Sequence, residues 1–387
     1  MHLTRSSLLY GILLTVWISS HAFINPQHIR AAELSQQKPP TYFVGTVQAV
    51  LHEKHVQELD QYVQTVQVEK VRSTENFTIQ FGSDVQPISA TQRLKKGSTV
   101  IVVAQTAFDG SAQYAISDIY RIPVLWWLLG GLVAVVFVVG RWQGMSAFAG
   151  MILSLWVLLG FIVPHILQGE NPLLISVLGA VVIGTITLYL SHGFSVKTHI
   201  SLLSLYAVLA LVALLTLWSV KLGHFVGLGS EEALFLQFGS TAHINLQGIL
   251  IGGIILGALG VIDDIVVSQV AVVFQLKAAQ EKSDFAELYA RGLSVGKEHV
   301  ASLVNTLALA YAGANLPLFL LFMLNSSTPV WVILNSEALA EEVVRTIVGS
   351  IGLVAAVPLT TFIAALVAVK IPYAKLRKIT ESHAHVH

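Results

Sequence analysis

Two adjacent carboxylates, Asp263 and Asp264, lie inside a long run of apolar and small residues, GALGVIDDIVVSQ. An aspartate at the centre of a membrane helix costs about 2.5–3.5 kcal/mol on insertion scales. That cost must be offset by a charged partner, bound water, a bound cation or protonation of the carboxylate. No lysine or arginine falls deep within the apolar segments of the chain. The sequence therefore predicts that a proton or a transient cation neutralises this acidic site.

Helical spacing separates the two aspartates. Residues at intervals of four, three, four and four share one face of a helix, and here they are Gly253, Gly257, Gly260, Asp264 and Ser268. Small residues let a second helix approach closely, so we expect Asp264 and Ser268 to point into a helix contact. Asp263 lies about 100° further round the helix, on an apolar stripe. Asp264 is therefore the principal candidate, and Asp263 is the weaker one.

The glycines leave the shape of this segment open. They lower its helix propensity, and the stretch that begins at His243 is longer than one membrane crossing needs. A broken or re-entrant helix would place backbone groups at a transport site. A straight, tightly packed helix explains the glycines equally well.

Two later apolar segments carry matching small and polar residues. Asn305 belongs to such a stripe in the first segment and Thr360 in the second, where Gly349 and Gly352 share its face and Pro358 can kink the helix. Hydroxyl, amide and carboxylate oxygens favour a hard cation or a proton over a soft metal. We therefore predict a transport or ion site formed by these side chains: Asp264, Ser268, Asn305 and Thr360, with Asp263 beside them.

An alternative interpretation gives the later polar residues a structural role. Asn305 and Thr360 would then only supply interhelical hydrogen bonds that hold small-residue packing together. The spacing does not decide between the two interpretations, and the identity of any bound metal stays open.

The composition indicates which elements must position these residues. A soluble globular domain is about 25% charged, whereas this chain of 387 residues is 11% charged and 54% hydrophobic, with a mean hydropathy of +0.71. A membrane helix needs about 20 apolar residues. Seven segments approach or exceed this length: 123–140, 145–166, 172–190, 200–220, 247–275, 300–324 and 347–369. The predicted fold is a mainly α transmembrane helical bundle over residues 123–370, with seven spans, or eight if an N-terminal span is retained.

The chain before these spans has a different character. Residues 1–24 show a basic residue, an apolar stretch and then small residues, which is typical of a secretory signal peptide, and an uncleaved anchor helix agrees equally well. Residues 41–120 contain about five short segments with alternating apolar and polar residues, separated by turn signals. We therefore expect a small exported β-rich domain of the OB-like barrel type.

Basic residues predict the orientation, because lysine and arginine collect on the cytoplasmic side. With residues 41–120 outside, the inner loops hold most of the basic residues beyond residue 122, including those of loop 276–299. The outer loops hold only Lys221 and Arg345. The tail, residues 371–387, is then cytoplasmic. Its histidines, His383, His385 and His387, could bind a divalent metal, although a solvated polar end explains them as well.

Several classes of function are excluded or disfavoured. The absence of cysteine excludes disulfides, zinc–thiolate sites and a cysteine nucleophile, and the zero net charge does not indicate a nucleic-acid partner. No Walker A, G-x-S-x-G or H-E-x-x-H motif is present, and adjacent aspartates on one helix point apart rather than forming a protease dyad. We therefore expect no enzyme and no cofactor. The expected partners are membrane lipids and a small cation or solute, and an oligomer is compatible with the sequence.

Three stretches resemble the YibE/F-like family of bacterial membrane proteins: GALGVIDDIVVSQ, VGKEHVASLVNTLALAYAGANLP and VRTIVGSIGLVAAVPLTTFIAA. The resemblance covers roughly residues 41–370. It implies a multipass protein of the bacterial cytoplasmic membrane, presumed to be a permease, and supplies no substrate. The family pattern maps onto these residues: Asp264, Ser268, Asn305, Thr306, Tyr311 and Gly313. Asp263 takes a place where the family more often has an apolar residue.

Two hypotheses about function follow. The first is a secondary or passive transporter that handles a cation, a proton or a cation-coupled small solute at the mid-membrane aspartate. The second is a membrane scaffold or signalling protein whose exported domain binds a partner, with the polar residues only joining helices.

Overall fold

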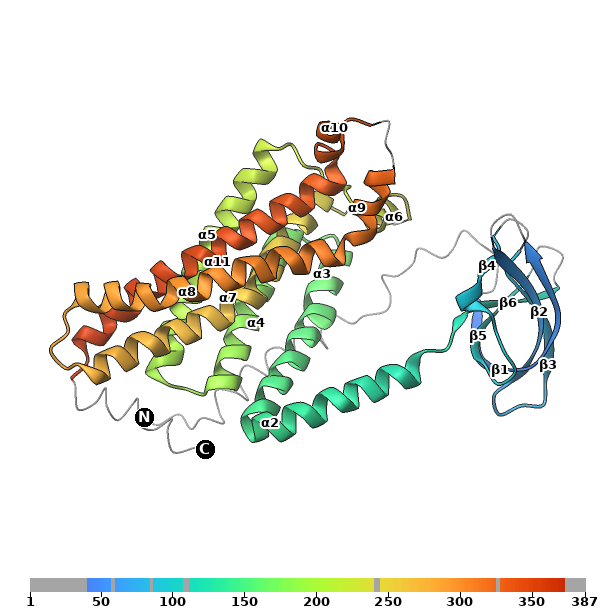
Figure 1. The fold of residues 1–387 in the computed structure, drawn as a ribbon, viewed down its shortest axis with the longest axis horizontal. Coiled ribbons are helices and arrows are strands. Elements are labelled where there is room, and N and C mark those ends of the chain that lie inside the picture. Colours follow the sequence, from blue (N-terminus) through green and yellow to red (C-terminus); the bar gives the residue numbers. More distant parts are fainter. Residues whose placement is uncertain are drawn as a thin grey trace. The chain divides into compact units, whose positions relative to one another are not determined.

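The computed structural model describes residues 40–56, 60–83, 86–106, 111–239, 244–324 and 328–372. The predicted signal peptide or anchor and the histidines of the tail lie outside these residues. The described residues divide into two compact units, one up to residue 138 and the other from residue 139 onward. The first unit is β-rich and the second is helical (Figure 1).

The β-rich domain is an antiparallel sheet with strand order β3-β2-β1-β5-β6, and β4 pairs with β2. Its strands are β1 (Thr41–Val56), β2 (Gln61–Lys70), β3 (Asn76–Phe81), β4 (Ile88–Ser89), β5 (Thr99–Thr106) and β6 (Ala112–Ile119). The first part of β1, up to Thr46, pairs with β5, and its later part, from Gly45 onward, pairs with β2 and carries two register shifts. Such irregularities bend a strand, so the sheet curves.

Curvature brings the edge strands β3 and β6 together. The ring centroids of Phe77 on β3 and Tyr114 on β6 are 4.4 Å apart, and the ring of Phe43 on β1 lies 5.3 Å from that of Phe77 and 6.4 Å from that of Tyr114. Alternate residues of β2 point inward, as its period-two pattern predicts, so that Val66 and Val68 are fully buried. The expected β-rich N-terminal domain is confirmed as a half-closed sheet with its own apolar core.

Among the described residues of this domain, the side chain of Gln64 is the one polar side chain that is buried, and its hydrogen-bonding groups have partners. Gln64 donates through Nε2 to Oε2 of Glu53 (2.6 Å) and accepts through Oε1 from the N–H of Leu94 (2.8 Å). Glu53 also forms an ion pair with Arg93. Burial raises the pKa of Glu53, but the hydrogen bonds from Gln64 and Arg93 outweigh it and leave the pKa below its ordinary value.

The helical part of the chain contains the predicted spans. Its helices are α2 (Ile122–Val157), α3 (Val163–Leu167), α4 (Pro172–His192), α5 (Val196–Leu222), α6 (Glu231–Gly239), α7 (Leu246–Ala279), α8 (Phe285–Ala314), α9 (Leu316–Leu324), α10 (Val330–Leu334) and α11 (Glu337–Lys370). Arg141 is not helical (φ 45°, ψ −135°) and divides α2, so that the first two apolar helices are Ile122–Trp142 and Gly144–Leu167. Within the described residues, six helices are long and apolar enough to cross a membrane. The bent pair α8–α9 makes a seventh if it is one span.

Helix α7 lies in the middle of the helical unit and packs on α4, α5, α8 and α11 (Figure 1). Its buried face carries Ile262 and Val266, which meet Leu205 of α5 and Leu353 of α11 in one core. Gly352 of α11 allows this approach, because a Cβ there would lie 2.4 Å from a methyl group of Val212. The predicted packing role of Gly352 therefore has a specific partner, the helix α5.

Three predicted boundaries differ from the structure. The loop expected at 276–299 is largely helical, because α8 begins at Phe285 and its N-terminus is capped by Asp284. The expected span 300–324 is bent by 63° between α8 and α9, at Asn315. Arg345 was expected in an outer loop, but α11 begins at Glu337 and holds Arg345 two turns inside the helix.

The structure also distinguishes between the two expected shapes of the acidic segment. Helix α7 runs without interruption from Leu246 to Ala279, with Asn245 accepting from the N–H of Gly248 at its start (3.0 Å). Its glycines therefore lie in a continuous helix and not at a break. Pro358 likewise lies inside α11 without ending it.

Candidate functional site

Asp263 lies at the contact between α7 and α4. Its Oδ2 accepts a hydrogen bond from Oγ1 of Thr187 (3.2 Å), and both residues are half-buried. The same hydroxyl lies 2.9 Å from the carbonyl oxygen of Ile183 in its own helix. Because a hydroxyl has one proton to donate, the carboxylate receives only a shared hydrogen bond.

Close packing of α4 on α7 brings Thr187 to Asp263. One turn before Thr187, a Cβ on Gly184 would lie 2.7 Å from Leu205 and 3.4 Å from Leu259. At the other end of the contact, a Cβ on Gly252 would lie 2.2 Å from Oγ of Ser176. Both glycines are buried, so the helices approach where side chains are smallest.

Asp264 lies on the other side of α7 and is exposed in the described structure, as are Gly257 and Gly260. A Cβ on Gly260 would meet no atom within 4 Å. Ser268 is half-buried, and its Oγ donates to the carbonyl oxygen of Ile265 in the same helix (3.0 Å). The stripe of small residues therefore turns away from the main core.

Only the first part of that stripe is covered by other helices. The hydroxyl of Tyr311 on α8 lies 3.1 Å from the position of a Cβ on Gly257. Nη1 of Arg345 on α11 lies 3.8 Å from the corresponding position on Gly253. These contacts end before Asp264 is reached.

The other predicted site residues do not gather around Asp264. Thr360 is fully buried in α11, and its Oγ1 has no hydrogen-bond partner among the described residues. Asn305 is exposed on α8. Gly349 packs under Leu307, with 3.4 Å between its Cβ position and a methyl group. No described hydrogen bond joins Asp264 to Ser268, Asn305 or Thr360.

Sequence reasoning missed Thr187 as a partner of Asp263. Thr187 lies in a span whose other residues are mostly apolar, and hydroxyls in helices usually bond to their own backbone. The spacing within one helix carries no information about which neighbour it faces. The position one turn after Gly184, on the face that packs closely, was the available signal.

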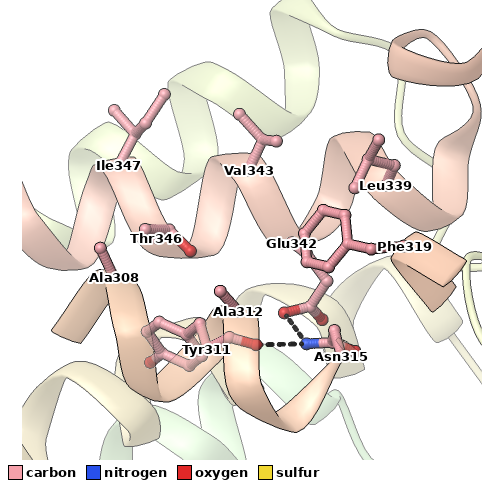
Figure 2. A pocket seen from close by; sticks show the side chains of 10 residues that line it. All are labelled: Ala308, Tyr311, Ala312, Asn315, Phe319, Leu339, Glu342, Val343, Thr346 and Ile347. Carbon is pink, nitrogen blue, oxygen red and sulfur yellow. Dashed lines mark hydrogen bonds between the residues drawn. The ribbon is translucent and has the colours of Figure 1, made fainter. Parts of the chain in front are cut away.

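A second polar group lies where α8 bends toward α9 and meets the first turns of α11 (Figure 2). Nδ2 of Asn315 donates to Oε2 of Glu342 (3.0 Å) and to the carbonyl oxygen of Tyr311 (3.1 Å). Arg345 forms an ion pair with Glu342 across 3.4 Å. Asn315 and Glu342 border a pocket of 210 Å³ with mostly apolar walls, lined by Ala308, Tyr311, Ala312, Asn315, Phe319, Leu339, Glu342, Val343, Thr346 and Ile347.

Neither aspartate of α7 has a basic partner in the described structure, where no lysine, arginine or histidine forms an ion pair with them. Within the same residues, no three histidine or acidic side chains gather in a way that could hold a metal ion. The acidic pair is therefore suited to a proton or a weakly held cation, with Thr187 as one neutral oxygen ligand.

Comparison with known proteins identifies the family. The family model described as YibE/F-like protein matches residues 128–370, which is well over half of the chain. No curated protein and no solved structure matches the chain. The matched region begins within α2, ends at the last residue of α11 and includes Asp263, Asp264 and Thr187. The chain belongs to the YibE/F-like family and is a multipass membrane protein.

Proposed function

We propose that this protein is a secondary or passive transporter that moves a proton, a cation or a cation-coupled small solute past the aspartate pair of α7. The observation that carries the proposal is the state of Asp263. Its carboxylate is half-buried at a helix contact, receives one shared hydrogen bond and has no basic partner in the described structure. A carboxylate held in this way needs a bound cation or a proton to neutralise its charge.

The neighbouring carboxylate strengthens this requirement. Asp264 follows Asp263 directly, and two adjacent negative charges oppose each other's ionisation. Asp264 is exposed, whereas Asp263 faces α4. We infer that Asp264 receives the cation or proton from the open side of α7 and that Asp263 holds it beside Thr187.

The orientation belongs to the same proposal. The β-rich domain would be exported, the C-terminal tail would be cytoplasmic, and the protein would lie in the cytoplasmic membrane of a bacterium. The excess of basic residues in the loops on the cytoplasmic side supports this arrangement. The proposal assigns no chemical conversion to the protein.

Flux in proteoliposomes tests the proposal. Liposomes loaded with a pH-sensitive dye are given a proton, Na⁺, K⁺ or Mg²⁺ gradient, with wild-type protein, Asp263→Asn, Asp264→Asn or no protein. A transporter loses flux in the aspartate variants while inserting normally. Full wild-type flux in Asp263→Asn contradicts the assignment of the site.

Deletion of residues 41–120 distinguishes the scaffold hypothesis from the transport hypothesis. The scaffold hypothesis rests on the separate apolar core of the β-rich domain. A scaffold would tolerate Asp263→Asn in a growth assay but fail when residues 41–120 are removed. A transporter would show the reverse.

A further inference from the structure

The pocket between α8, α9 and α11 has apolar walls and one polar end. Its apolar lining residues are Ala308, Ala312, Phe319, Leu339, Val343 and Ile347. The short side chains of Ala308 and Ala312, one helical turn apart, point toward α11 and keep the space between the helices open (Figure 2). The volume of 210 Å³ equals that of about seven molecules of liquid water. The pocket therefore has room for a small molecule with an apolar part.

Asn315 holds the carboxylate of Glu342 at the polar end of the pocket. Its Nδ2 donates to Oε2 of Glu342 (3.0 Å) and to the carbonyl oxygen of Tyr311 (3.1 Å). A carbonyl oxygen can only accept a hydrogen bond, so the nitrogen and not the oxygen of the amide faces both partners. Because both N–H groups of Nδ2 are engaged, the amide of Asn315 has no donor left for a ligand.

Glu342 has acceptor sites left over for a ligand. Its Oε2 accepts from Asn315, and its Oε1 lies 3.4 Å from Nε of Arg345. That Nε forms no hydrogen bond within the described part of the chain, so the contact with Arg345 is an ion pair without an aligned hydrogen bond. A carboxylate offers about four lone-pair sites. The side chain of Glu342 is 21% exposed, so a ligand in the pocket can reach the remaining sites.

The other groups around the pocket favour a positive charge. Residues 300–324 of α8 and α9 carry no charged side chain, and Glu342 is the charged member of the lining. The rings of Tyr311 and Phe319 belong to the lining (Figure 2), and the faces of aromatic rings attract cations. The hydroxyl groups of Tyr311 and Thr346 can accept hydrogen bonds from a ligand. An anionic ligand would instead meet the negative charge of Glu342.

We propose that this pocket binds a small organic cation, an amine or ammonium compound whose charged nitrogen lies at Glu342 and whose apolar part lies along Ala308 and Ala312. A bare inorganic cation is a poor match, because such ions need several oxygen ligands and the walls are mostly apolar. The pocket lies between α8, α9 and α11, whereas Asp263 lies at the contact of α7 with α4. The proposal therefore goes beyond the proposed transport function and does not depend on it.

Isothermal titration calorimetry of the full-length protein in lipid nanodiscs tests the proposal, with benzylammonium as the probe. Benzyl alcohol (uncharged), benzoate (anionic) and methylammonium (without the apolar part) are titrated in parallel, and empty nanodiscs measure uptake by the lipid. We expect saturable binding of benzylammonium and binding of the other three that is weaker by about tenfold or more, because each lacks the charge or the apolar contact. Equal binding of benzyl alcohol, or no saturable binding of benzylammonium, overturns the proposal.

Substitutions locate the bound probe. Glu342→Gln removes the charge but keeps an oxygen that can accept from Asn315, and it should weaken benzylammonium binding by about tenfold or more. Ala312→Leu should fill the pocket and abolish binding, whereas the matched control Ala310→Leu changes an exposed position outside the lining and should leave binding unchanged. Asp263→Asn should also bind the probe normally, whether or not transport depends on that aspartate. Wild-type affinity in Glu342→Gln or in Ala312→Leu would place the probe elsewhere and overturn the proposal.

Discussion

The two faces of α7 differ in what covers them. One face, with Ile262 and Val266, is completely buried against α4, α5 and α11. The opposite face, with Gly257, Gly260 and Asp264, is exposed in the described structure. Asp263 lies between the two faces and is the aspartate that reaches a neighbouring helix, through Thr187.

This difference shows which features determine the face of a membrane helix that packs against its neighbours. In a soluble helix the apolar stripe faces the core, but in a span both faces are apolar and the stripe gives no direction. A stripe of small residues permits close approach without requiring it. In α7 the aliphatic face packs instead, and the glycines that allow it lie on the partners, at Gly184 and Gly352, and on α7 itself, at Gly252.

The largest expected effect is that of Asp263→Asn on transport. The variant removes the charge that we assign to the cation or proton site, so flux should fall to the level of protein-free liposomes. The amide is nearly isosteric, so the protein should still insert and give the wild-type elution profile in detergent. Asp264→Asn should reduce flux less, because it removes only the exposed group. Equal losses of flux in both variants would contradict the different roles that we assign to Asp263 and Asp264.

A matched pair of glycine substitutions tests the packing of the two faces. Gly352→Ala places a methyl group 2.4 Å from Val212 and should destabilise the helical unit by about 1–3 kcal/mol. Gly260→Ala meets no atom within 4 Å and should be neutral or stabilising by up to about 1 kcal/mol, because alanine favours helix. Thermal unfolding followed by helical circular dichroism in detergent measures both. Destabilisation by Gly260→Ala would mean that another protein segment packs on the face of α7 that contains Gly260.

Thr187→Val should have a smaller effect on transport. It removes the one hydrogen bond to Asp263, which is shared with Ile183, and we expect a loss of about 1 kcal/mol, or about fivefold in apparent affinity for the transported cation. The control is Thr185→Val, since the hydroxyl of Thr185 contacts Tyr206 and not Asp263. Concentration dependence of flux in proteoliposomes measures both. Equal effects of the two substitutions would point to a general loss of helix packing.

The smallest effect concerns the β-rich domain. Because the folded-state pKa of Glu53 is lowered, its contribution to stability is present above its unfolded pKa and is lost as pH falls through the lowered value. Glu53→Gln should therefore lower stability slightly at neutral pH and leave it unchanged at acidic pH. Hydrogen exchange of β1 and β2 in the full-length protein measures this. A difference that persists at acidic pH would assign the effect to packing around Gln64 instead of charge.

The sequence predicts the membrane spans well because a long run of apolar residues is enough to identify each span. Six of the seven apolar segments beyond residue 122 each match one apolar helix, and the seventh, 300–324, falls on the bent pair α8–α9. The alternation in β2 predicts its buried valines. Contacts between helices could not be predicted in the same way. The pairing of Asp263 with Thr187 depends on how α4 rotates against α7, and the helical position of Arg345 depends on the acidic turns that begin α11.

The central claim is that Asp263 binds the transported proton or cation, and infrared difference spectroscopy of the protein in lipid tests it most directly. The difference spectrum is taken between a low and a high concentration of protons or of the transported cation. We predict a carboxyl C=O band that changes with binding in wild type and in Gly260→Ala and is absent from Asp263→Asn. A band that persists unchanged in Asp263→Asn would contradict the assignment of Asp263 as the binding group.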